Sequence, residues 1–161
     1  MTKKFASQND MTEKKISFTE VGKDLWAFTA EGDPNSGVII GDDSVMIVEA
    51  QATPRLANKV IECVRTVTDK PISHVVLTHY HAVRVLGASA FGASQIIMGE
   101  TARAMVVERG QEDWDSEFQR FPRLFEGYES IPGLTWPTTT FSDDMTVYLG
   151  NRQINLMHLG R

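Results

Sequence analysis

Two histidines separated by one residue are the side chains of this chain best suited to bind a metal ion. His79 and His81 follow residues 72–77, an apolar run with the length and composition of a buried strand. Side chains alternate along an extended segment, so residues two apart lie on the same side and can reach one ion. Zinc binds imidazole nitrogen at ~2.0–2.1 Å. An isolated H-x-H pattern also arises by chance on a surface, so its context must decide.

Three of the four histidines, the third being His158, lie at the ends of expected strands, where side chains can converge on a rim. A third ligand added to an H-x-H pair would complete a catalytic-type site that leaves a position open for water. The fourth histidine, His74, precedes the apolar part of its strand. We expect this lone histidine to be structural or to face solvent.

The elements that carry these histidines begin as an antiparallel meander and continue as alternating strands and helices. Thr53 suits an N-cap and Pro54 the first helical position, and apolar residues then recur at helical spacing. We expect helices at 54–68 and from 101 to about 109, and a hairpin turn at 150–151. Residues 111–137, rich in acids, aromatics and proline, are expected to be irregular, partly helical excursions over one face. Strands are expected at 16–21, 25–30, 38–40, 45–49, 72–77, 95–98, 145–149 and 153–157.

Length and charge exclude several classes of partner. The chain has 161 residues, the length of one domain, with 16 Lys and Arg against 21 Asp and Glu. No basic stripe with interleaved aromatics is present, which argues against nucleic acid. The longest apolar stretches fall far short of the ~20 residues that cross a bilayer. Residues 1–15 are polar and lack a signal-peptide core, so we expect a disordered arm and a cytoplasmic protein.

The single cysteine, Cys63, cannot form an internal disulfide. Its helical register with Leu56, Val60 and Val67 places it on the apolar face of the helix expected at 54–68. We expect an inert core thiol.

The histidine segment L-T-H-Y-H-A-V-R-V-L-G-A, residues 77–88, resembles the signature loop H-x-H-x-D-H, followed by Gly, of the metallo-β-lactamase superfamily. Further similar segments are N-S-G-V-I-I at 35–40, V-M-I-V-E at 45–49 and L-M-H-L-G-R at 156–161. The resemblance covers about residues 16–161. It implies an α/β fold, an αββα sandwich with a mixed sheet and helices on one face. It also implies a zinc ion held by His79, His81 and His158.

The chain departs from the signature at two positions. The superfamily's Asp and next His fall on Val83 and Arg84, neither of which can bind a cation. We therefore expect one zinc ion and no second metal site. The guanidinium of Arg84 either takes the place of the second cation and contacts a substrate carboxylate or phosphate, or it pairs with an acid such as Glu49.

The sequence ends at Arg161, just beyond the third implied ligand. The superfamily fold consists of two similar halves, so residues 16–161 are expected to form a partial domain, truncated at its C-terminus. Such a half leaves a sheet edge and an apolar face uncovered. We expect it to self-associate or to pair with the missing C-terminal half.

The resemblance implies a metal-dependent hydrolase that uses metal-bound water to attack a small-molecule ester, thioester or amide-like substrate. Glu49, at a strand end near the site by fold analogy, is a candidate general base. The alternative is a non-catalytic or degenerate binding protein with the same fold and one metal or none. The substitutions Val83 and Arg84 favour that alternative.

Overall fold

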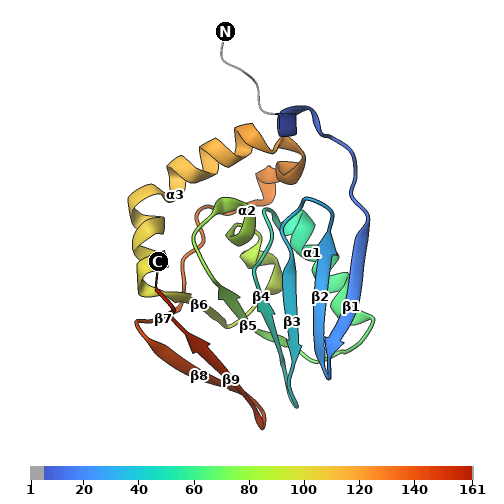
Figure 1. The fold of residues 1–161 in the computed structure, drawn as a ribbon, viewed down its shortest axis with the longest axis vertical. Helices are drawn as coiled ribbons and strands as arrows, with labels where there is room; N and C mark the ends of the chain where they lie inside the picture. The colour runs from blue at the N-terminus through green and yellow to red at the C-terminus, as the bar shows by residue number, and fades with distance from the viewer. Residues whose placement is uncertain (1–5, 161) are drawn as a thin grey trace.

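A computed structural model describes residues 6–160 of the chain. Its seven-stranded sheet runs in the order β1-β2-β3-β4-β5-β6-β7 and is antiparallel from β1 to β4 and parallel from β4 to β7 (Figure 1). The mixed sheet expected from the sequence is thereby confirmed. The strands of this sheet are β1 (Ile16–Gly22), β2 (Leu25–Ala30), β3 (Ser36–Ile40), β4 (Val45–Val48), β5 (Ile72–Leu77), β6 (Gln95–Gly99) and β7 (Thr139–Phe141).

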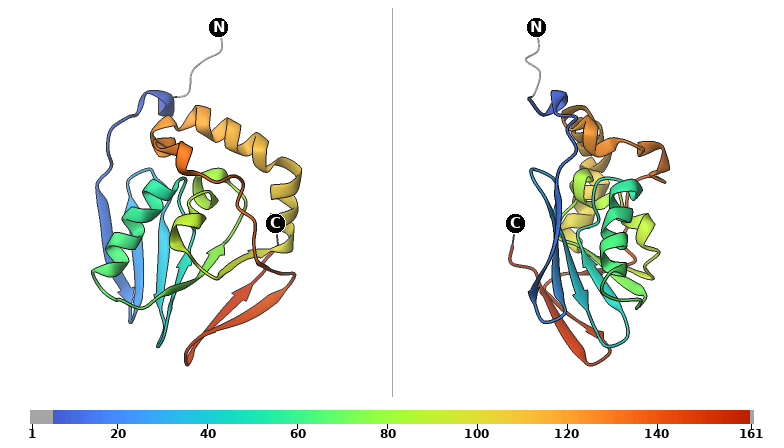
Figure 2. Two further views of the ribbon diagram at one scale, coloured as in Figure 1. Left: turned by 180° about the vertical axis from the view of Figure 1, so that it is seen from behind. Right: turned by 90° about the vertical axis from the view of Figure 1, so that its right-hand side faces the viewer.

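Helices cover one face of this sheet and a separate hairpin covers part of the other (Figure 2). The hairpin consists of β8 (Asp144–Leu149) and β9 (Arg152–Met157), joined at the predicted turn. The helices are α1 (Pro54–Arg65), α2 (Ala82–Val85) and α3 (Glu100–Arg120), with short 3-10 turns η1 (Ala6–Asn9), η2 (Ala88–Phe91), η3 (Pro122–Phe125) and η4 (Tyr128–Ser130).

Alternate residues of the central strands enter two different cores. In β4, Ile47 packs into the larger core beneath the helices, whereas Met46 packs into a second core beneath the hairpin. Val76 of β5 also enters the second core, together with Val147 and Leu149 of the hairpin. Because both faces are covered, the central strands are apolar throughout and not alternating. The hairpin thus forms a second, two-stranded sheet packed on the face opposite the helices.

Helix α1 begins as the sequence predicts and ends earlier. The Oγ1 of Thr53 accepts a hydrogen bond from the Leu56 amide at 3.3 Å, which satisfies one of the free amides of the first turn. The last residue of α1 is Arg65, followed by Thr66, whose hydroxyl donates to the Cys63 carbonyl. Cys63 packs partly buried against the core, as its register predicts.

Helix α3 extends beyond the end expected near residue 109, into the segment 111–137 that was expected to be irregular and partly helical. It continues to Arg120, because residues 111–120 contain no proline and form helical side-chain pairs such as Gln111 with Asp115. Irregular chain begins at η3, and strand β7 beyond it was not expected. In residues 6–160 no helix combines the length and the apolar run needed to cross a membrane.

The N-terminal segment differs from the disordered arm expected at residues 1–15. Residues 1–5 lie outside the described part of the chain, but residues 6–15 contact the folded domain. The Gln8 amide donates to the Gln119 carbonyl of α3 at 2.9 Å, and Glu13 pairs with Lys59 of α1 at 2.9 Å. Because these contacts are polar, the segment has no apolar periodicity from which its contact with the domain could be predicted.

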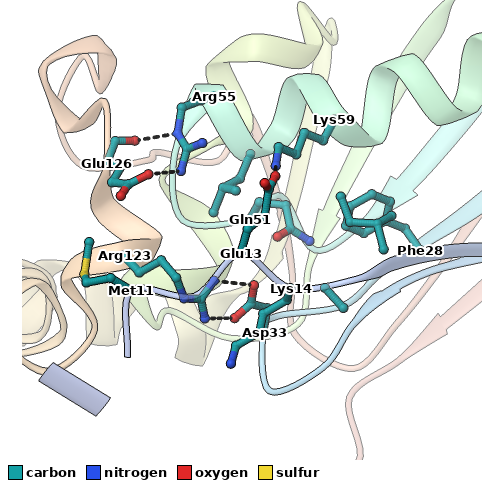
Figure 3. Close-up of a pocket in the computed structure, with 13 residues that line it drawn as sticks. Met11, Glu13, Lys14, Phe28, Asp33, Gln51, Arg55, Lys59, Arg123 and Glu126 are labelled. Carbon is teal, nitrogen blue, oxygen red and sulfur yellow. Dashed lines mark hydrogen bonds and ion pairs between the residues drawn. The ribbon is translucent and has the colours of Figure 1, made fainter. Parts of the chain in front are cut away.

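Ion pairs join η3 to other parts of the fold near this segment (Figure 3). Arg123 of η3 forms a bidentate pair with Asp33 of the loop between β2 and β3. Arg55 of α1 pairs with Glu126, just beyond η3, at 3.0 Å. These residues line the small hollow drawn in Figure 3, and their charges are paired with one another.

Gly87 is the glycine near the end of the histidine segment, residues 77–88, and we predict that Gly87→Ala destabilises the fold. A Cβ at this position would clash with the Ala50 carbonyl oxygen and lie 2.8 Å from that of Thr53. Overpacking of this kind costs about 1–3 kcal/mol, measurable by urea unfolding. Gly37→Ala is the matched control, because its Cβ would meet Val48 at an ordinary 3.4 Å. Equal stabilities for the two variants would contradict the prediction.

Candidate functional site

The two histidines of the H-x-H pair lie side by side on the segment between β5 and α2. The ring centroids of His79 and His81 are 4.9 Å apart, with the ring planes at 74°. The end of β5 delivers His79, and α2 begins at Ala82, directly after His81. The structure therefore brings these two residues together as the sequence predicts.

Neighbouring polar groups contact the Nδ1 side of the His79 ring. Its Nδ1 lies 2.8 Å from the Thr78 hydroxyl and 3.7 Å from Oε2 of Glu49. Burial lowers the pKa of His79, and the nearby positive charges of His81 and Arg84 lower it further. A neutral imidazole with one nitrogen engaged by a polar neighbour is the form in which histidine binds metals.

Glu49, the candidate general base, is buried beneath the histidine segment, with a relative exposure of 6%. One carboxylate oxygen accepts a hydrogen bond from the Thr78 amide at 2.6 Å. The other has no hydrogen-bond partner in residues 6–160, although His79 and Arg84 lie within ion-pair distance. Burial raises the pKa of this carboxyl group. The carboxylate thus holds the segment around His79 through contacts with Thr78, His79 and Arg84.

Arg84 lies against Glu49, which is the second of the two roles considered for it. Its Nε is 3.9 Å from Oε2 of Glu49, and its backbone carbonyl accepts a hydrogen bond from Ala50 at 2.7 Å. The neighbouring Val83 is partly buried against the larger core. The two departures from the signature thus contribute an ion pair and an apolar contact.

His158 lies just beyond the end of β9, away from the paired histidines. Its Nε2 is 3.1 Å from the hydroxyl of Thr101, at the start of α3. Residues 6–160 contain no group of three or more His, Cys, Asp or Glu side chains positioned to hold a metal ion. The structure therefore places His158 apart from a common cluster with His79 and His81.

A cleft of about 960 Å³ connects His79 with His158. It lies between the ends of β5 and β6, the first turns of α3 and the end of β9. Its walls are mainly apolar, with Glu108 as their acidic side chain and no Lys or Arg among the described residues that line it. Sequence analysis missed Thr101 and Glu108, because nothing in a helix pattern shows which turn will face a cleft. The smaller hollow of about 160 Å³ in Figure 3 is lined by paired charges instead.

Comparisons with known proteins agree on one fold. A metallo-beta-lactamase type 2 from Bacillus sp. (strain 170) is 24% identical over 148 residues, which cover 86% of this chain and 58% of that protein. The metallo-beta-lactamase from Pontibacter korlensis superposes with a TM-score of 0.63 at 14% identity, over 88% of this chain and 59% of that one. The metallo-beta-lactamase FIM-1 from Pseudomonas aeruginosa, in its mono-zinc form, gives a TM-score of 0.59 at 15% identity, over 88% and 58%. No protein-family model matches the chain.

This chain has the metallo-β-lactamase fold. It spans 58% of the length of the metallo-beta-lactamase from Bacillus sp. (strain 170). The α/β class and the mixed sheet with helices on one face are those of the fold.

The metallo-β-lactamase fold implies zinc, and the residues present fit such an ion in part. His79 and His81 supply two adjacent imidazoles, and the pKa of His79 is shifted toward the neutral form that binds metal. Val83 supplies no donor atom, and Arg84 supplies a positive charge where a ligand for a second ion would be needed. The side chains therefore fit at most one ion. His158, the candidate third ligand, lies apart from His79 and His81 in this structure.

We predict that Arg84 and Glu49 are energetically coupled. Arg84→Met leaves a buried carboxylate without its cation and lowers stability, whereas the same change in a Glu49→Gln background costs less because no charge remains to be paired. A double-mutant cycle measured by urea unfolding should give a coupling free energy of about 1 kcal/mol. Strictly additive effects would show that the 3.9 Å approach contributes no stabilisation.

Proposed function

We propose that this chain belongs to a hydrolase that uses one zinc ion, with His79 and His81 as two ligands and His158 as the candidate third. The observation that carries the proposal is the adjacent histidine pair, whose rings are 4.9 Å apart and of which His79 lines the cleft. The mono-zinc form of FIM-1, which shares the fold, supports a single ion. The substrate is a small molecule with an ester, thioester or amide-like bond.

A zinc ion bound here would lower the pKa of its water toward ~7 and so provide a nucleophile at neutral pH. The residues of the chain have other tasks. His79 and His81 act as ligands and not as acids or bases. Thr78 and Glu49 hold the ring of His79 through its Nδ1 side, in the manner of polar groups that orient metal-bound histidines.

Arg84 would supply a fixed positive charge in place of a second metal ion. Its guanidinium is beside Glu49 and contributes to lowering the pKa of His79. It is not among the residues that line the cleft, which favours an effect on the histidine segment over direct contact with a substrate anion.

The cleft favours an uncharged substrate with an apolar group. Met105, Phe141 and Leu156 contribute apolar surface, and Glu108 adds a negative charge without a lysine or arginine in the described lining to balance it. A substrate carboxylate or phosphate would meet repulsion there, whereas an apolar acyl or aryl group would be transferred out of water at a gain of about 25 cal/mol per Å².

A non-catalytic binding protein with the same fold is the second candidate function. It is favoured by Val83 and Arg84, which exclude a second metal site, and by the position of His158 against Thr101. Binding of a neutral apolar ester without turnover, by a chain that holds metal, would support this candidate over the hydrolase.

We predict that metal binding depends on the paired histidines. His79→Ala and His81→Ala should each abolish binding of zinc at micromolar concentration in isothermal titration calorimetry, because only two of the three proposed ligands would remain and the adjacent pair would be lost. His74→Ala is the matched control; His74 is five residues away on β5, with its Nδ1 at the Ser73 hydroxyl, and should bind as the parent does. His158→Ala tests the third ligand and should weaken binding by at least tenfold. A parent chain that binds no zinc, or a His81→Ala chain that binds it fully, would exclude the proposal.

We also propose that the chain self-associates through the hairpin and the segment that follows it. Met157 and Leu159 are 62% and 89% exposed there, next to the unpaired edge of β9. Multi-angle light scattering should detect a dimer or larger species, which Met157→Lys should weaken. Val107→Lys, on the surface of α3 at 62% exposure, serves as the control. A monomer at all accessible concentrations would contradict this proposal.

A further inference from the structure

The histidine segment is anchored to a residue far along the chain. The amide of Ala82, the residue directly after His81, donates a hydrogen bond to Oδ2 of Asp113 on α3 at 2.7 Å. The two residues are 31 positions apart, and α2 and α3 pack against each other. The bond therefore links the backbone that carries His81 to a long helix outside the segment.

We propose that Asp113 is a positioning residue for the histidine pair. Its carboxylate fixes the Ala82 amide and thereby the backbone from which the side chains of His79 and His81 project. Where metal binding is concerned, the inference rests on the proposed function. The anchoring itself does not.

The need for this carboxylate follows from the burial of Ala82. Ala82 is 2% exposed and begins α2, so its amide belongs to the first turn, where a helix cannot satisfy its own donors. A buried donor without a partner costs about 1–3 kcal/mol. Asp113 satisfies this amide from α3, at 2.7 Å.

The same bond leaves the imidazole of His81 available for a ligand. His81 stands at the N-cap position of α2, where a side chain commonly accepts a hydrogen bond from the first turn. Its side chain makes no such bond. Because Asp113 caps the turn from α3, His81 keeps its position at the start of the helix without committing its ring to capping.

A second contact from α3 involves Tyr80, the residue directly before His81. Arg109 lies near the Tyr80 hydroxyl, which raises the pKa of the Arg109 guanidinium, and the Tyr80 ring meets the His81 ring edge-on, with centroids 4.8 Å apart. Arg109 and Asp113 are four residues apart on α3 and so share one face of the helix. This face of α3 thus holds the chain immediately before and immediately after His81.

The anchoring is tested by hydrogen exchange of the Ala82 amide, measured by NMR at residue resolution. Asp113→Ala should speed exchange at Ala82 by about tenfold or more, whereas Asp113→Asn, whose side-chain oxygen can still accept the bond, should retain most of the protection. Asp115→Ala is the control, because Asp115 is exposed on the same helix and its carboxylate accepts a hydrogen bond from Gln111 of that helix. Unchanged protection of Ala82 in Asp113→Ala would overturn the proposal whether or not metal binds.

The effect on the histidines is tested by titration with Co²⁺, monitored by its visible absorption. Loss of a group that orients metal ligands weakens binding about 10–100-fold, so Asp113→Ala should fall in that range, and Asp113→Asn should stay within about threefold of the parent. Equal Co²⁺ affinity in the parent and Asp113→Ala chains would overturn the positioning role. If the parent binds no Co²⁺ or Zn²⁺, the proposed hydrolase fails, and the exchange experiment still decides the anchoring.

Discussion

The buried carboxylate of Glu49 is the constraint on which the arrangement of the site depends. A charged or polar group removed from water must be satisfied within the protein, and the described partners of the Glu49 carboxylate come from residues 78–84. The chain reaches this position by a left-handed backbone at Glu49 and again at Gln51, with φ of 67° and 69°. Such backbone costs about 1 kcal/mol or more at a residue other than glycine. Hydrogen bonds from Ser36 to the Glu49 carbonyl and from the Gln51 amide to Ser36 offset that cost.

The histidine segment is therefore held from two sides by different kinds of interaction. The turn after β4 holds it through the carboxylate of Glu49 and through backbone bonds, from Ala50 to the Arg84 carbonyl and from Gly87 to that of Gln51. Helix α3 holds it through Asp113 and Arg109. Val83 and Arg84 occupy the two positions at which the superfamily signature has metal ligands. Here Val83 packs against the core and Arg84 pairs with Glu49, so these side chains hold the segment. Its geometry does not require a second ion.

Sequence patterns predicted the parts of this fold that rest on local signals. Apolar runs predicted the central strands, the Thr53 cap predicted the start of α1, and the H-x-H spacing predicted the pairing of His79 with His81. Patterns failed where packing between distant segments decides. The last turns of α3 carry acids and aromatics, and sequence patterns placed the end of this helix near residue 109. The three-residue strand β7 is fixed by its pairing with β6. Asp113 escaped notice for the same reason, since its partner lies 31 residues away.

The two candidate functions differ in whether His158 binds a metal ion. The free energy of its hydrogen bond to Thr101 can be compared with that of zinc binding. Its hydrogen bond to Thr101 is of a kind that contributes about 1 kcal/mol net, whereas zinc bound by a full set of protein ligands contributes about 10 kcal/mol or more. That bond alone is therefore too weak to keep His158 from a metal ion. The stronger restraint is the hairpin itself, because Val147 and Leu149 fix its inner face in the second core and the His158 amide is bonded to the Asp143 carbonyl at 2.7 Å. Ligation by His158 thus depends on how far the chain beyond β9 can turn toward β5 while the hairpin stays packed.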